Sequence, residues 1–128
     1  MKKLVFILLI LILLVLVGCE VNTQFVDEYN QKLTHVNLLS TEHNELVNKI
    51  NSNMESVQYK KDYIKWVDEN MDDFIDFKSF IETNYKELEK AGVNPDYVRD
   101  NIVDVINTMQ QNQLNFRQSL AVLEMFNQ

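Results

Sequence analysis

The chain has 128 residues, with 12 basic and 19 acidic side chains, a formal net charge of −7 and a single cysteine. An acidic chain does not suit nucleic acid, because that binding depends on Lys and Arg neutralising phosphates. One cysteine provides neither a disulfide nor a thiolate metal cluster, so the fold must rest on packing. A chain of this length buries enough apolar surface for one domain.

The first element in the chain is a basic start followed by an apolar run. Lys2 and Lys3 precede fourteen apolar residues, from Leu4 to Val17, without a polar break. This order is typical of an export signal. As a helix the run would be roughly 21 Å long, shorter than the roughly 30 Å of a bilayer core, which disfavours the alternative of an uncleaved transmembrane anchor.

The run ends in Leu16-Val17-Gly18-Cys19, which resembles the lipobox of prokaryotic membrane lipoproteins. The resemblance implies that residues 1–18 are a cleaved signal peptide and that Cys19 carries a lipid. Residues 19–24 would then be a short tether, and residues 25–128 a domain on the extracytoplasmic face of the cell membrane, or of the outer membrane in a two-membrane cell. Without the two leader lysines, the formal charge is −9.

Helix breakers are almost absent from the rest of the chain. Between Cys19 and Ala91 there is no Gly or Pro, and the only interruption is Gly92-Val93-Asn94-Pro95. The sequence therefore predicts an all-α domain of long helices. Gly92 suits a left-handed C-terminal cap, whereas Asn94 can cap a new helix whose first turn contains Pro95.

Before that turn, apolar residues recur in two sets at steps of three and four, a pattern typical of helices with coiled-coil-like packing. The sets do not share one helical phase, which predicts a turn between Gln58 and Asp62, with Asp62 as the N-cap. One continuous helix with a phase shift is the alternative. The two sets are Tyr29, Leu33, Val36, Val47, Ile50, Met54 and Val57, and Val67, Met71, Phe74, Ile81, Tyr85 and Leu88.

A third set follows Pro95 and is interrupted by four consecutive amides, from Gln110 to Gln113. Amides in a helical seam can fix its register by demanding partners, and the equally open alternative is that they face solvent. The third set comprises Val98, Ile102, Val105, Ile106, Met109, Phe116, Leu120 and Leu123.

Together these patterns predict three long antiparallel helices in a coiled-coil-like bundle, with a long helical hairpin as the alternative. The middle helix has the widest apolar surface, because Trp66, Phe77 and Phe80 lie to one side of its main stripe. Such a helix has two neighbours in the bundle. The same three side chains are also candidates for binding a protein partner.

Residues that could carry chemistry are few. His35 and His43 would lie about 12 Å apart along a helix, too far to share a metal ion. No serine is flanked by the glycines of a nucleophile elbow. An acidic run along one helix face is expected to be solvated, because it lacks the glycine turn of a calcium-binding loop. We therefore expect no metal, no cofactor and no enzymatic activity. The run comprises Asp68, Glu69, Asp72, Asp73 and Asp76.

The functional expectation is a membrane-anchored lipoprotein of the cell envelope that acts as a helical module for binding another protein. A self-associating coiled-coil spacer is the first alternative, suggested by the helical repeat and by the amides in its seam. An immunity or exclusion lipoprotein is a narrower alternative, which rests on analogy alone.

Overall fold

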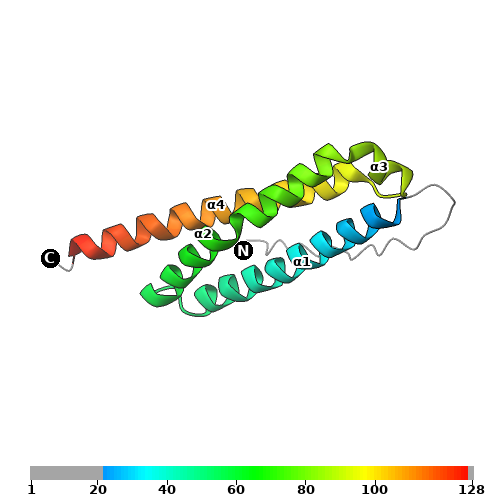
Figure 1. Cartoon of the computed structure of the whole chain (residues 1–128). Coiled ribbons are helices and arrows are strands. Elements are labelled where there is room, and N and C mark those ends of the chain that lie inside the picture. Colours follow the sequence, from blue (N-terminus) through cyan, green and yellow to red (C-terminus); the bar gives the residue numbers. More distant parts are fainter. Residues whose placement is uncertain (1–21, 127–128) are drawn as a thin grey trace.

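The computed structural model describes residues 22–126 of the chain, and this part is all-α, as the sequence predicts. It consists of α1 (Thr23–Ser52), α2 (Val57–Thr83), α3 (Tyr85–Lys90) and α4 (Pro95–Phe126). Figure 1 shows that α2 returns along α1 and that α4 then returns along α2. The described part therefore has four helices, three long and one short, where three were expected.

The turn between α1 and α2 lies at residues 53–56, a few residues before the predicted position. Ser56 is the N-cap of α2, and its side-chain oxygen accepts a hydrogen bond from the backbone N–H of Tyr59 at 3.2 Å. Asp62 lies inside the helix and accepts a hydrogen bond from Gln58, so its assignment as the cap was wrong. The alternative of one continuous helix was also wrong.

The extra helix comes from a break at Asn84, which the sequence analysis did not predict. Both the backbone N–H and the side-chain amide of Asn84 donate to the carbonyl of Phe80, which ends α2. Asparagine can satisfy backbone groups in this way and therefore competes with helix continuation. The short α3 is then joined to the start of α4 by a 2.8 Å hydrogen bond from the Tyr85 hydroxyl to Asp96.

The turn around Gly92 has the predicted chemistry. Gly92 has a φ of 81°, a left-handed conformation that favours glycine, and the Val93 N–H donates back to the carbonyl of Leu88 at 3.0 Å. Asn94 caps α4, because its side-chain oxygen accepts from the Tyr97 N–H at 3.1 Å. Pro95 is the first residue of that helix. These predictions are confirmed.

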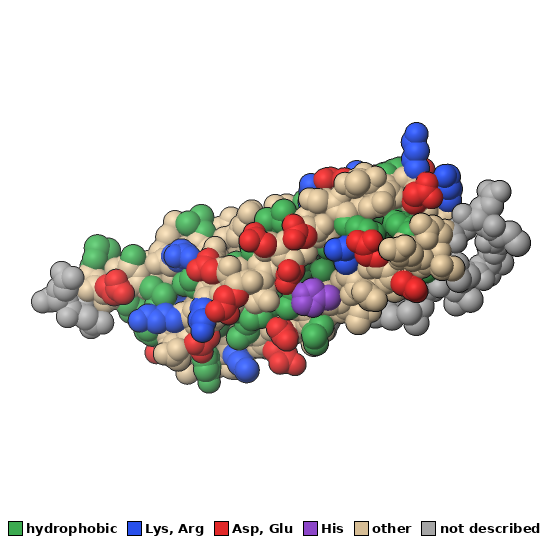
Figure 2. Space-filling model, in the orientation of Figure 1, with side chains coloured by type: hydrophobic (Ala, Val, Ile, Leu, Met, Phe, Trp, Pro, Cys, Tyr) green, Lys and Arg blue, Asp and Glu red, His purple; other side chains and the backbone are tan. Residues whose placement is uncertain are grey.

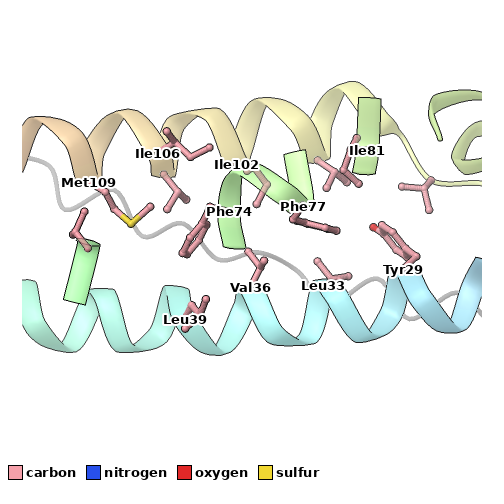
Figure 3. Packing of buried hydrophobic residues seen from close by; sticks show 14 of the residues in the cluster. Tyr29, Leu33, Val36, Leu39, Phe74, Phe77, Ile81, Ile102, Ile106 and Met109 are labelled. Carbon is pink, nitrogen blue, oxygen red and sulfur yellow. The ribbon is translucent and has the colours of Figure 1, made fainter. Parts of the chain in front are cut away.

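The hydrophobic core runs along the inner faces of all four helices, and α2 packs against both α1 and α4. In Figure 3, Val36 of α1 lies near Phe74 of α2 and Leu33 of α1 lies near Phe77, while Ile102 and Met109 approach from α4. The predicted stripes account for most of the buried residues. Tyr63 and Phe77 belong to the core as well, although both lie outside the predicted stripes.

Candidate interaction surface

The predicted lipid-attachment residue, Cys19, lies outside the described residues, but the helix that follows it has a defined start. Asn22 caps α1 by accepting a hydrogen bond from the backbone N–H of Gln24 at 3.0 Å. Asn22 is three positions after Cys19 in the chain, so the two residues lie at most about 11 Å apart. The start of α1 lies beside α3, at the end of the bundle opposite the end of α4 (Figure 1).

Trp66, one of the three candidate partner-binding residues, lies half-buried between α1 and α2. Its indole N–H donates to the Glu42 carboxylate at 3.0 Å, and its ring lies 5.9 Å from the ring of His43. Both contacts are made with α1, the neighbouring helix. Trp66 therefore already contributes to the packing between two helices of the same chain.

Phe77 and Phe80 also contact α1. Phe77 is 1% exposed and packs against Tyr29, so its side chain is not accessible on the surface of the described structure. Phe80 is half-buried and stacks on Phe25 with ring centroids 5.8 Å apart, and the Lys32 ammonium lies 5.5 Å from its centroid. The wide apolar surface of α2 thus corresponds to the middle position of that helix in the bundle.

A buried polar group joins the three long helices near the middle of α2. His43 Nε2 and the Tyr63 hydroxyl are 2.9 Å apart, and Asn112 forms a side-chain hydrogen bond to Tyr63. Burial lowers the pKa of His43, against an opposing hydrogen bond from Asn44, and raises the pKa of Tyr63 to about 12. Both side chains therefore stay neutral at pH 7. The burial of Tyr63 could have been predicted from its position, because Tyr63 lies four residues before Val67 and so extends the second stripe by one helical turn.

The amide run takes both of the courses that the sequence left open. Gln110 and Gln111 are exposed, as the solvent-facing alternative expects. Gln113, by contrast, donates to Asp68 at 2.7 Å and to the carbonyl of Ile64 at 3.3 Å, and Asn112 bonds to Tyr63. Half of the run is therefore solvated, and the other half makes polar contacts with α2.

Two residues of the acidic run, Asp68 and Asp73, make polar contacts with neighbouring helices. Asp68 accepts two hydrogen bonds from Arg117 on α4, at 3.0 and 3.1 Å. Asp73 lies 2.9 Å from His35 Nε2 of α1. Within residues 22–126, no three His, Cys, Asp or Glu side chains are grouped closely enough to hold a metal ion. No helix in that range is sufficiently long and apolar to cross a membrane.

The largest uncovered apolar side chains lie at the end of α4, in the segment that we call the tip (residues 114–126). Met125 is 69% exposed and Phe126 is 83% exposed, and Leu114 and Val122 are also exposed. Figure 1 shows the end of α4 extending past the start of α2, and Figure 2 shows apolar side chains on this end of the molecule. The tip thus has less cover than the rest of α4.

Two apolar faces meet at the tip. Phe116, Leu120 and Leu123 continue the core stripe of α4, and of these Phe116 makes an edge-to-face contact with Tyr63 at 5.1 Å. A helix of 3.6 residues per turn places Leu114 and Met125 on the opposite side. A surface helix normally has one apolar stripe. This segment has apolar residues on two opposite sides, and none of its residues is buried.

More apolar residues are exposed where α1 turns into α2, at the same end of the bundle. Met54 is 68% exposed, and Val57 is also exposed. The buried Lys60 in the first turn of α2 donates from Nζ to the Ser119 hydroxyl of α4 at 2.8 Å, which brings this turn close to the tip. The sequence analysis had placed Met54 and Val57 in the first core stripe, whereas both point into solvent.

Comparison with known protein families, with characterised proteins and with solved structures found no match for this chain.

Proposed function

We propose that the chain is a membrane lipoprotein, attached through a lipid on Cys19, and that its helical bundle binds another protein through the tip of α4. The observation that carries this proposal is the opposite placement of two ends. The start of α1, four residues after Cys19, lies at one end of the bundle, and the tip lies at the other (Figure 1). At 1.5 Å per residue, the 30 residues of α1 separate the two ends by about 45 Å.

Packing of the coiled-coil type would give the bundle the stiffness to hold its tip away from a lipid surface. The finer part of our proposal is that α1, α2 and α4 pack lengthwise in this way. Support comes from buried residues that recur every seven positions, the spacing of a heptad. In α1 these are Tyr29, Val36, His43 and Ile50, and in α2 and α3 they are Val67, Phe74, Ile81 and Leu88.

The charge distribution favours a protein partner over an anionic lipid surface. Residues 22–104 contain nine basic and seventeen acidic side chains, a balance of −8, so the body of the bundle is repelled by anionic headgroups. A lipid on Cys19 would overcome that repulsion, because each buried methylene stabilises membrane attachment by about 0.8 kcal/mol. The tip itself contains only Arg117 and Glu124 as charged residues, which leaves its apolar side chains free to make contacts.

Two measurements test the proposal. Cys19→Ser should abolish lipid attachment, so mass spectrometry should find no acyl chains and the chain should leave the membrane fraction. A photoreactive residue in place of Met125 should form adducts with a protein in intact cells. The same residue in place of Leu38, an apolar residue of the body that is 57% exposed, is the matched control and should not. Acylation that persists in Cys19→Ser, or equal adducts at both positions, contradicts the proposal.

A further inference from the structure

The face of the tip that points away from the core has the pattern of a helix–helix seam. Leu114, Gln118, Ala121 and Met125 follow one another at steps of four, three and four, which places them in one stripe. None of them is buried. A seam of this kind accepts another helix lengthwise, with the side chains of each helix entering the spaces of the other.

The charge of the molecule restricts which helix can approach. The body carries a balance of −8 over residues 22–104, whereas residues 105–126 contain one cation, Arg117, and one anion, Glu124. Two copies of the chain repel one another along their bodies and not along this neutral segment. The tip is therefore the part of the surface where a second copy can pack with least repulsion.

The two charges specify a direction. Arg117 and Glu124 are seven residues apart and lie on the same edge of the seam. When two identical helices pair antiparallel, like edges face each other, so that Arg117 of each copy lies opposite Glu124 of the other. A parallel pair would instead set this edge against Asn115 and Val122, which carry no charge. Charges beside the seam determine the orientation of paired helices in this way.

The same register pairs the apolar residues. With Arg117 against Glu124 of the second copy, Leu114 lies against Met125 and Gln118 against Ala121, so that a large side chain meets a large one at both ends. Arg117 can make the new contact, because its two bonds to Asp68 both come from Nη2. Its side chain is 53% exposed.

We propose that the partner of the tip is a second copy of this chain, bound antiparallel through residues 114–125 with two reciprocal Arg117–Glu124 ion pairs. The proposal rests on the proposed function, because it names the partner of the same surface. Since α1 begins at the other end of the bundle, the two Cys19 residues lie at opposite ends of the pair. A pair of this shape bridges two lipid surfaces or lies along one.

The exposed area suits a pair that forms and separates readily. Within residues 114–125, Leu114, Val122 and Met125 are 50%, 45% and 69% exposed, which corresponds to roughly 300 Å² of apolar surface if each offers roughly 150 to 200 Å². A standard interface takes about 800 Å² from each partner, a little over half of it non-polar. Gln118 in the seam lowers the affinity, so we expect dissociation constants between about 1 and 100 µM.

Disulfide crosslinking tests the register in the full chain, purified in detergent. Leu114→Cys and Met125→Cys chains should crosslink when the two are mixed and not when either is alone, because two copies of residue 114 lie about 16 Å apart along the antiparallel pair. The parent chain, with Cys19 only, is the control. Crosslinking of either variant with itself overturns the antiparallel register, and no crosslink in the mixture overturns the pairing.

Charge exchange provides the second test, read by sedimentation of the full chain in detergent. Arg117→Glu and Glu124→Arg should each weaken self-association at least about tenfold, because each sets like charges together. The double variant restores opposite charges and should restore association, although its residue 117 no longer pairs with Asp68. Equal weakening in all three variants overturns the pairing. If the photoreactive residue at position 125 formed adducts only with a different protein and the chain did not self-associate, the inference of a second copy would be wrong and the proposed function would stand. If that residue formed no adduct with any protein, the proposed function would be wrong as well.

Discussion

The two halves of α4 carry the same apolar spacing and have different surroundings. In the first half, Val98, Ile102 and Met109 are buried against α2 and the rest of the core. From Gln110 to Phe126 no residue is buried, although Phe116, Leu120 and Leu123 continue the stripe. The difference follows from the lengths of the two helices, since α4 has 32 residues and α2 has 27. The two helices run in opposite directions, and the last turns of α4 extend past the first residue of α2 (Figure 1).

An apolar stripe in a sequence therefore predicts that a helix face is to be covered, but it does not say which segment or partner covers it. The first half of α4 is covered by the chain itself. The tip is largely exposed, and its second face, with Leu114 and Met125, adds to the apolar surface that the chain leaves uncovered. This second face adds nothing to the packing within the chain, and for this reason we propose that the tip binds a partner while the first half stabilises the fold.

The largest expected effect on stability comes from comparing the same kind of substitution, Phe to Ala, in the packed core and at the tip. Phe74 is 0% exposed at the centre of the core, so Phe74→Ala removes a large buried ring and should lower the free energy of unfolding by about 3 to 5 kcal/mol. Phe126→Ala at the tip should change it by less than about 0.5 kcal/mol. Urea unfolding, followed by circular dichroism at low protein concentration, measures both values.

Comparable losses from the two substitutions would contradict the division between a packed half and an uncovered tip. If Phe126→Ala destabilised the chain only at high protein concentration, the result would indicate that the tip is covered in an assembly, because association stabilises the folded state by mass action. The comparison is therefore made at two protein concentrations.

A smaller effect is expected where the packed half gives way to the tip. Tyr63 contacts both regions, through His43 on one side and Phe116 on the other. Tyr63→Phe leaves the ring in place and removes the partner of His43 Nε2, so it should cost about 1 to 3 kcal/mol. Tyr85→Phe is the matched control, because its hydroxyl also forms a hydrogen bond, to Asp96, but at the surface, where water replaces a lost partner. Equal losses would show that burial adds nothing to the effect of the polar contact at Tyr63.

Much of the fold could be predicted because its signals are local. The turn at Gly92 combines a glycine at positive φ, a capping Asn94 and a Pro95 in the first helical turn, and each acts within a few residues. The apolar steps of three and four likewise reflect the geometry of one helix. The break at Asn84 could not be predicted in this way, because its signal is a single side chain that bonds to the backbone of Phe80.

The position of the first turn and the location of the exposed surface depend on contacts between helices. Met54 and Val57 fit the spacing of the first stripe, but α1 ends at Ser52. Both residues therefore lie beyond the part of α1 that packs against α2, and both are exposed. Trp66 and Phe80 appeared to be surplus on one helix and are used against α1. Phe116, Leu120 and Leu123 of the tip were assigned to the third apolar stripe, but none of them is buried. The lengths of the neighbouring helices, which leave the tip largely uncovered, are not visible in the spacing of its own residues.

The smallest expected effect is the loss of stability at acidic pH that comes from the buried His43. It distinguishes this buried histidine from the exposed His35. Burial lowers the pKa of His43 below its ordinary value of 6.5. As the pH falls through 6.5, the unfolded chain binds a proton that the folded chain does not, so stability decreases until the pH reaches the folded pKa. The groups facing His43 are the Tyr63 hydroxyl, the Trp66 ring and the Asn44 side chain, and none of them carries a charge that would hold the proton.

Because the many carboxylates also titrate in acid, the effect of His43 is measured as a difference between two proteins. His43→Gln keeps a polar side chain at the position and removes the titration. The free energy of unfolding, obtained from urea titrations at pH 7.5 and pH 5, should fall less in His43→Gln than in the parent. His35→Gln is the control, since His35 is exposed beside Asp73. If the parent and His43→Gln lost the same stability between the two pH values, the imidazole of His43 would accept a proton as readily in the folded chain as in the unfolded one. The contact between His43 and Tyr63 would then be open to water, as the tip is.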